Sequence, residues 1–167
     1  RLVAKLKAIG KLENTLILFL SDNGCSAEKG TFGWQYPKNK RENFKQWRNQ
    51  SGRSASQGEG WSNASNAPFR KHKRWVHEGG ISTPFIASWP GQIEPGTITH
   101  EPTQLIDINA PCIDAASAPY PTEYNDNEIT PLEGESFLSL LRGGSWSRDK
   151  TIFWEHEGNS AARNGEW

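Results

Sequence analysis

Residues 14–24 read NTLILFLSDNG, and this stretch decides the fold class of the chain. Residues 16–20 are all apolar, whereas a strand with one solvated face would alternate apolar and polar side chains. An unbroken apolar run is typical of a strand buried on both faces of a parallel sheet. The polar residues 21–24 follow at the carboxyl end of this strand, where open α/β sheets place their ligands. We therefore expect an α/β domain with a ligand site at this end of the strand.

Apolar spacing on either side of this strand predicts the other elements. The mixture of helical and strand-like segments indicates an α/β sandwich rather than a helical bundle or a barrel. Pro111 predicts a kink or an early end in the helix that contains it. We expect one domain over residues 1–145, followed over residues 146–167 by the start of a smaller antiparallel subdomain. The predicted helices cover residues 2–9, 102–116 and 134–142, and the predicted strands cover residues 85–89, 151–154 and 159–163.

Residues 26–67 lack apolar periodicity and are rich in Gly, Ser, Asn and Gln. They include the basic stretch KNKRENFKQWRNQSGR at 38–53. A long irregular segment inside a compact domain predicts a functional loop. For residues 37–56, a solvated insertion is an equally good interpretation.

The 167 residues carry no net charge, but the charge is divided along the chain. Residues 1–100 hold 15 Lys and Arg against 7 Asp and Glu, a balance of +8, whereas residues 101–167 hold 4 against 12, a balance of −8. The basic part favours an anionic partner or substrate. No apolar run approaches the ~18 residues that a membrane span needs, so we expect none.

Two cysteines, Cys25 and Cys112, are too few for a disulfide-rich scaffold and lack the spacing of a CxxC metal site. They either pair with each other or stay buried and reduced. The second state is favoured, because lone cysteines behave as small apolar side chains. The chain contains no methionine and opens on RLVAKLKAIG, which predicts a piece of a longer protein.

Asp22 and Asn23 are the first candidates for a site, because they follow the buried strand directly. A carboxylate and an amide offer two hard oxygen donors, and calcium accepts mixed shells of this kind. The alternative is a plain turn, since Asp, Asn and Gly all favour turns. Two donors do not complete a calcium shell, so further carboxylates would have to come from elsewhere.

The second candidate is the basic cluster RKHKR at 70–74, which precedes a Gly-Gly turn. Cations packed before a sharp turn suit an anion such as sulfate or phosphate. A solvated charge run is the alternative. Nucleic-acid binding is disfavoured by the zero net charge and the lack of a regular basic helix. His156 lies between two glutamates and faces either a cleft or solvent, and the four histidines lack zinc-site spacing.

Three segments together resemble the latter half of a type I sulfatase of the alkaline-phosphatase-like superfamily. They are NTLILFLSDNG at 14–24, PFRKHKRWVHEGGISTPFIASWPG at 68–91 and FWEHEGNSAARNGEW at 153–167. The resemblance, which is closest to bacterial arylsulfatase-type enzymes, covers nearly the whole chain apart from the basic loop. It implies an alkaline-phosphatase-like α/β sandwich and a sulfuric ester hydrolase that uses one calcium ion and a formylglycine nucleophile.

The resemblance also implies roles for individual residues. Asp22 and Asn23 fall on the family's Asp-Asn pair, which supplies two calcium ligands. Lys73, five residues before Glu78 in K-x-W-x-H-E-G-G, falls on the lysine that contacts the sulfate group. We assign His156 no catalytic role and expect it to lie near the substrate.

The chain departs from the family pattern in several places. The C/S-x-P-x-R segment whose first residue becomes formylglycine is absent, and neither cysteine fits it. Two further carboxylate ligands, a lysine and histidines that the family carries upstream are also absent. Near Asp107, the family's D-x-x-P-T reads D-I-N-A-P, which predicts an altered helix start. We therefore expect the nucleophile upstream of this chain and expect the isolated chain to be inactive.

Two alternatives remain open beside a sulfatase. One is a phosphodiesterase or phosphonate hydrolase of the same superfamily, and the other is a non-catalytic protein that binds sulfated glycans. For a sulfatase, the resemblance implies a sulfated small molecule or glycan as substrate, aryl or carbohydrate sulfates included. It also implies a periplasmic or secreted location.

Overall fold

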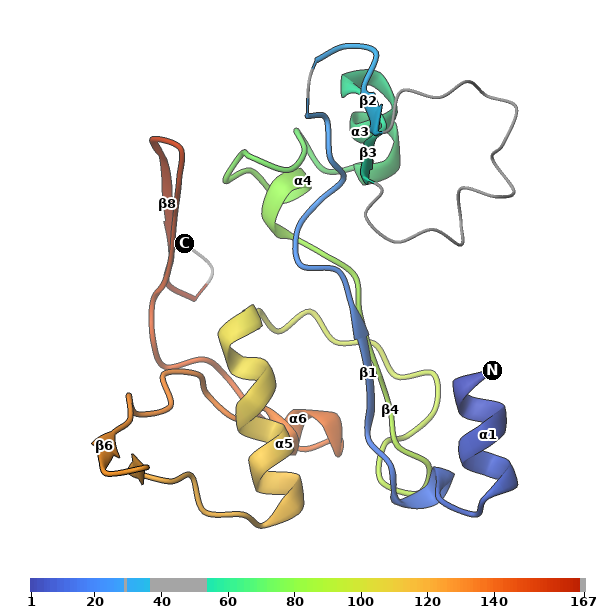
Figure 1. Ribbon diagram of the computed structural model, residues 1–167, viewed down its shortest axis with the longest axis vertical. Coiled ribbons are helices and arrows are strands. Elements are labelled where there is room, and N and C mark those ends of the chain that lie inside the picture. The colour runs from blue at the N-terminus through green and yellow to red at the C-terminus, as the bar shows by residue number, and fades with distance from the viewer. Residues whose placement is uncertain (29, 37–53, 166–167) are drawn as a thin grey trace. The chain divides into compact units, whose positions relative to one another are not determined.

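The computed structural model describes residues 1–28, 30–36 and 54–165 of the chain (Figure 1). The chain divides into two compact units. The first unit contains residues 1–20, 85–152 and 163–167, and the second contains residues 21–84 and 153–162. The sequence-based boundary between residues 145 and 146 stays a prediction.

The first unit begins as the sequence predicts, with helix α1 at Leu2–Ala8. Gly10 follows with a φ of +64°, a left-handed conformation that suits glycine and ends the helix. The short 3₁₀ helix η1 at Leu12–Asn14 then leads into strand β1 at Ile17–Leu20. Local stop signals therefore place both elements correctly.

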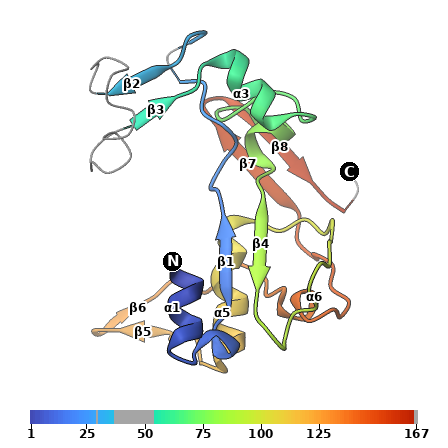
Figure 2. The same cartoon turned by 90° about the vertical axis from the view of Figure 1, so that its right-hand side faces the viewer.

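The predicted parallel pairing of β1 is wrong for the described residues. β1 pairs with β4, at Phe85–Ser88, and the two strands run antiparallel with Ile17 opposite Ser88 and Leu20 opposite Phe85 (Figure 2). The predicted burial of β1 on both faces is also wrong for the described residues, because Phe19 and its partner Ile86 are 66% and 59% exposed. An apolar run indicates burial but carries no information on the direction of the neighbouring strand.

The helix predicted at 102–116 is two elements. The 3₁₀ helix η3 covers Leu105–Ile108, and α5 covers Asn109–Ala116. Pro111 is buried in the first turn of α5, where a helix has no internal acceptor for a backbone N–H. The proline therefore fits the start of a helix instead of ending one, which corrects the prediction.

Residues next to helix α6, at Leu138–Leu141, contribute to the buried core of the first unit. Phe137 is 1% exposed, and its ring meets those of Phe85 at 5.7 Å and Trp146 at 6.2 Å in edge-to-face arrangements. Aromatic pairs favour this geometry, which adds to the area they bury. A small exposed hairpin, β5 at Glu123–Tyr124 and β6 at Asn127–Glu128, lies between α5 and α6 in the sequence.

The second unit contains regular structure where the sequence predicts none. Strands β2 at Trp34–Tyr36 and β3 at Ser54–Ser56 pair antiparallel, and helix α3 covers Glu59–Asn66. Residues 26–67 are therefore not wholly irregular. The basic stretch 38–53 falls outside the described residues.

The tail forms the two strands that the sequence predicts. They are β7 at Ile152–His156 and β8 at Asn159–Arg163, which pair with each other. Glu157 and Gly158 join them with φ values of +50° and +78°, the conformation of a tight hairpin turn.

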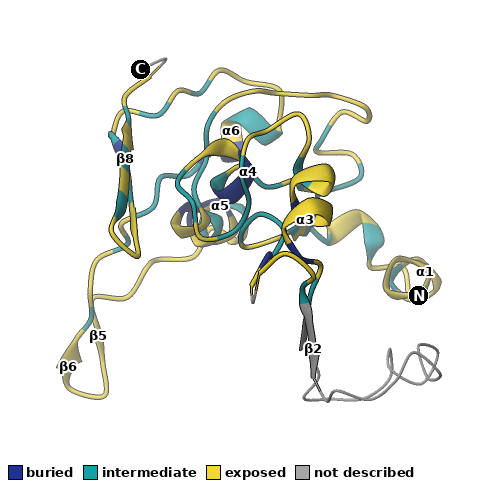
Figure 3. Ribbon diagram, turned by 90° about the horizontal axis from the view of Figure 1, so that it is seen from above, coloured by how far each residue is buried: buried dark blue, intermediate teal, exposed yellow. Residues whose placement is uncertain are grey.

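Few of the described residues are buried, and they include parts of α4, at Glu78–Ile81, and of α5 (Figure 3). Both cysteines are free, which agrees with the favoured reduced state, but their predicted burial is wrong because Cys112 is exposed and Cys25 is only half-buried. Within the described ranges, no helix is long and apolar enough to cross a membrane.

Candidate anion and metal site

Asp22 and Asn23 follow β1, as the sequence predicts, and begin a loop in the second unit. Asp22 is exposed and Asn23 is half-buried. The next residue, Gly24, donates its backbone N–H to the carbonyl oxygen of Gly80 at 2.9 Å. This hydrogen bond ties the loop after β1 to α4.

Glycines at this junction allow the backbones to lie in contact. A Cβ on Gly24 would overlap the carbonyl oxygen of Gly79, and a Cβ on Gly79 would overlap those of Arg70 and Lys71. Gly79 also donates its N–H to the carbonyl of Arg70 at 2.9 Å. The glycines of the E-G-G turn are thus explained by close packing of three backbone segments.

Replacing Gly24 with alanine is expected to destabilise the protein by about 1–3 kcal/mol, the usual cost of forcing extra atoms into a packed site. The matched control is Gly60→Ala in α3, where an added Cβ meets nothing within 4 Å and φ is not left-handed. The control is expected to stabilise the protein by up to about 1 kcal/mol, since alanine favours helix. Urea unfolding of both variants measures the difference, and equal midpoints would contradict the close packing.

Lys73 is held beside the same loop. Its backbone N–H donates to the carbonyl of Cys25 at 3.0 Å. The Asn66 side chain bridges the two segments, because its Oδ1 accepts from the N–H of Cys25 and its Nδ2 donates to the carbonyl of Lys71, both at 3.1 Å. The structure therefore fastens the turn that carries Lys73 to the loop that carries Asp22 and Asn23.

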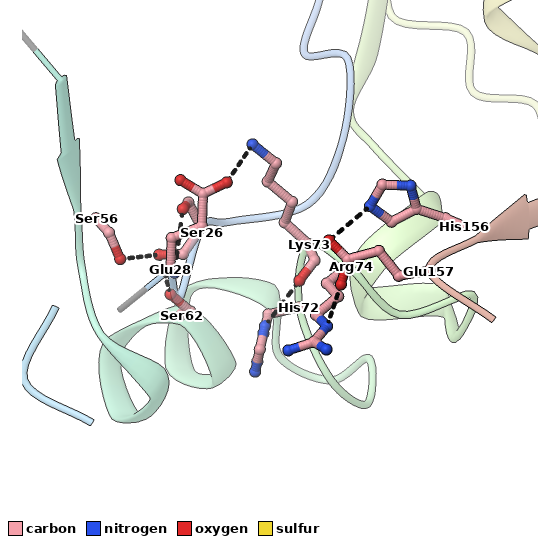
Figure 4. A network of polar contacts seen from close by, with 9 residues as sticks. All are labelled: Ser26, Glu28, Ser56, Ser62, His72, Lys73, Arg74, His156 and Glu157. Carbon is pink, nitrogen blue, oxygen red and sulfur yellow. Dashed lines mark hydrogen bonds and ion pairs between the residues drawn. The ribbon is translucent and has the colours of Figure 1, made fainter. Parts of the chain in front are cut away.

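The Lys73 side chain forms an ion pair in which its Nζ lies 2.8 Å from Oε1 of Glu28 (Figure 4). The two side chains are 37% and 58% exposed. An exposed ion pair of this kind contributes only about 0–1 kcal/mol. The Glu28 carboxylate therefore occupies a position on Lys73 that another oxyanion can take at small cost.

The backbone around Lys73 is unusual. Lys71 and Arg74 have φ values of +71° and +96°, a region that non-glycine residues rarely adopt. The Nζ of Lys71 lies 4.6 Å from the centre of the Trp75 ring, a cation–π contact. The ring nitrogen Nδ1 of His72 lies 3.0 Å from the carbonyl oxygen of Lys73.

His156 is linked to the turn that carries Lys73 through Glu157, the next residue in the sequence. Its Nε2 lies 3.8 Å from Oε1 of Glu157, and Oε2 of Glu157 lies 2.6 Å from Nε of Arg74 (Figure 4). His156 is exposed and therefore accessible to solvent. Its expected proximity to a substrate stays a prediction.

Sequence reasoning missed Asn66, Glu28 and Glu157. Each has a partner in the site that is distant in sequence: Asn66 lies 41 positions from Cys25, Glu28 lies 45 from Lys73, and Glu157 lies 83 from Arg74. The Glu157-Gly158 turn is readable from sequence, but its contact with Arg74 is not, because the contact depends on tertiary structure. No group of three or more His, Cys, Asp or Glu suited to a metal occurs among the residues that the structure describes.

The fold and these contacts define a class, an α/β protein whose strand-end loop is joined to a basic turn. Comparison with known proteins identifies the family. The sulfatase family model matches residues 1–118. An arylsulfatase of Klebsiella aerogenes is 30% identical over 146 residues, which cover 83% of this chain and 31% of the relative. A sulfatase of Schizosaccharomyces pombe is 28% identical over 178 residues, which cover 100% of this chain and 31% of the relative.

Solved structures agree with the sequence comparison. The crystal structure of the PsFucS1 sulfatase from Pseudoalteromonas sp. matches with a TM-score of 0.61 and 27% identity, over 97% of this chain and 26% of that one. The chain belongs to the sulfatase family, and the expected alkaline-phosphatase-like α/β fold is confirmed. It spans about a third or less of the length of these proteins.

Proposed function

We propose that the complete protein hydrolyses sulfate esters and that this chain supplies Lys73 as the sulfate contact. The observation that carries the proposal is the hydrogen-bonded junction of the Lys73 turn with the loop of Asp22 and Asn23, in a chain of the sulfatase family. The same junction would place an anion-binding cation beside oxygen donors. Aryl or carbohydrate sulfates are the proposed substrate class, and the Klebsiella aerogenes relative is an arylsulfatase.

Lys73 is proposed to act through its charge. Its ammonium group would exchange the Glu28 carboxylate for a sulfate oxygen, since both partners are oxyanions and the existing pair is exposed. The hydrogen bond from the Lys73 N–H to the Cys25 carbonyl keeps the Cα of Lys73 in place. A positioned cation stabilises negative charge that develops on the sulfate or on the leaving oxygen during hydrolysis.

Asp22 and Asn23 are proposed to hold calcium. The donor set fits a hard cation, because a carboxylate and an amide oxygen are both ligands that calcium accepts. They would form part of a shell of 6–8 oxygens, and the family resemblance implies that other ligands lie outside this chain. Bound calcium would supply Lewis-acid polarisation of the sulfate, and a formylglycine would supply the attacking oxygen. A periplasmic or secreted location and a role for His156 near the substrate are part of the same proposal.

Peptide-mass mapping and metal analysis of the complete purified protein test this proposal. We expect a C/S-x-P-x-R peptide with its first residue converted to the aldehyde, together with bound calcium. The Asp22→Asn variant is expected to keep the converted peptide and to lose calcium, because the amide removes a charged ligand. An unconverted or absent nucleophile peptide would reject the sulfatase and favour a glycan-binding protein or a phosphodiesterase. Unchanged calcium in the variant would reject Asp22 as a ligand.

A further inference from the structure

The turn between β7 and β8 contacts the turn that carries Lys73. Both segments lie in the second compact unit. The contact is the ion pair between Glu157 and Arg74, whose Oε2 and Nε atoms lie 2.6 Å apart. Glu157 and Arg74 are separated by 83 positions in the sequence, so the pair is a tertiary contact rather than a consequence of local chain geometry.

Arg74 has an unfavourable backbone conformation for a residue with a side chain. Its φ of +96° lies in a region that glycine adopts without strain and that is unfavourable for other residues. Such conformations persist only when the surrounding structure enforces them. The Glu157 carboxylate is the group that the structure places on the Arg74 side chain, within a tight hairpin turn whose own geometry is fixed by Gly158.

The conformation of Arg74 bears directly on Lys73, because the two residues form one turn and share a peptide bond. The N–H of Lys73 is fixed by the Cys25 carbonyl at 3.0 Å on one side. On the other side, the direction of the chain depends on the φ of Arg74. If Arg74 adopted a negative φ, the peptide plane between Lys73 and Arg74 would rotate. The direction of the Lys73 Cα–Cβ bond would then change.

We propose that Glu157 is a positioning residue for anion binding. By holding Arg74 in its left-handed conformation, it keeps Lys73 aimed at the sulfate group. The proposal rests on the proposed role of Lys73. It gives the β7–β8 hairpin a role in anion binding, because the hairpin carries Glu157. Glu157 acts through Arg74 and makes no contact with the substrate.

Simple electrostatics predicts the opposite effect of removing Glu157. A carboxylate in the neighbourhood of Lys73 repels an incoming anion, so neutralising it would strengthen anion binding if charge alone mattered. Loss of positioning would weaken binding, because only the fraction of molecules with Lys73 correctly placed would bind. The sign of the change therefore separates the two mechanisms.

The test measures kcat and KM for para-nitrophenyl sulfate on the complete protein, in wild type and in an Arg74→Gly background. In wild type, Glu157→Gln is expected to raise KM about three- to fivefold, the upper limit for the loss of an ion pair whose side chains are 63% and 52% exposed. The change in kcat is expected to be small, because saturating substrate selects the competent conformation. In the Arg74→Gly background, the same change is expected to alter KM less than about twofold, because glycine adopts the left-handed conformation without help. Glu155→Gln, the same charge change at an exposed position of β7, is the matched control and is expected to leave KM unchanged.

Four results would overturn the proposal. A lower KM in Glu157→Gln would show that Glu157 acts only by repelling the anion, and an unchanged KM would show that Glu157 does not affect anion binding. An equal rise in both backgrounds would mean that Glu157 acts without Arg74. A lower kcat at unchanged KM would indicate a smaller folded fraction instead of a misplaced lysine. A Lys73→Ala variant assayed in parallel separates this test from the proposed function, since normal kinetics there would reject the role of Lys73 itself.

Discussion

Replacing Lys73 with alanine is expected to lower kcat/KM for sulfate ester hydrolysis by about a hundredfold to a thousandfold, the usual cost of removing one preorganised charge-stabilising group. The substitution removes the ammonium group proposed to meet the sulfate. It also leaves the Glu28 carboxylate, now 2.8 Å from Lys73 Nζ, without that cation at the site of an incoming anion. Both effects raise the energy of the bound sulfate and of the transition state. Steady-state kinetics of the complete protein with an aryl sulfate provides the measurement.

Two further variants sharpen this result. Lys71→Ala is the matched control, because its ammonium group packs on the Trp75 ring and has no proposed sulfate contact, so turnover should stay close to that of the parent. Adding Glu28→Gln to Lys73→Ala is expected to recover part of the lost binding by removing a negative charge that repels the incoming anion. Turnover near the parent value in Lys73→Ala would reject the assignment of the sulfate contact.

Sequence periodicity and stop signals predict the elements of this chain well where the deciding interactions are local. α1 ends before Gly10, and the β7–β8 hairpin turns at Glu157-Gly158, because glycine relieves the left-handed conformations needed there. β1 and β4 are found for the same reason, as short apolar runs bounded by turn residues. Their antiparallel pairing could not be predicted, since the direction of a partner strand is a non-local property.

Helix α3 shows a second limit of sequence reasoning. The side chain it buries is Ser62, whose hydroxyl donates to the carbonyl of Ser26 at 2.7 Å, and Trp61 beside it is 73% exposed. Apolar periodicity cannot reveal a helix that is attached through a hydroxyl group instead of an apolar stripe. The prediction of an irregular segment failed there for that reason.

The residues of the candidate site can be predicted from the sequence, but most of the contacts that join them cannot. Asp22, Asn23 and Lys73 are visible in the sequence because carboxylate, amide and ammonium groups follow an apolar strand or precede a glycine turn. Their joining through Asn66 and through the packed glycines is visible only in the structure. Glu28 lies in a stretch with no periodic or motif signal, and Glu157 lies in a recognisable turn whose contact with Arg74 is tertiary, so no local pattern could assign either ion pair.

The largest stability effect is expected from Asp107→Ala in the first unit. Asp107 is fully buried and accepts hydrogen bonds from the backbone N–H groups of Gln104 at 2.6 Å and Glu135 at 2.9 Å. It also pairs with Arg148, whose side chain is only 6% exposed. These contacts join the start of η3 to the segments around Glu135 and Arg148.

Removing the Asp107 carboxylate leaves a buried guanidinium and two backbone N–H groups without their acceptor. Breaking one side of a buried ion pair typically costs about 3–5 kcal/mol, because the remaining charge stays desolvated. The nearby Glu135 carboxylate lies 3.5 Å from Arg148 Nη1 and compensates only in part, since it does not replace the hydrogen bonds to the backbone. We therefore expect Asp107→Ala to lower the free energy of unfolding by about 3–5 kcal/mol.

Urea or thermal unfolding of the complete protein measures this loss, with Asp114→Ala as the control. Asp114 is an exposed aspartate on α5, and its replacement is expected to change stability by no more than about 0.5 kcal/mol. Arg148→Met combined with Asp107→Leu offers a further comparison, because removing both charges together avoids the unpaired ion. The double variant should be more stable than Asp107→Ala alone. Equal stability of Asp107→Ala and Asp114→Ala would show that the buried pair does not hold this unit together.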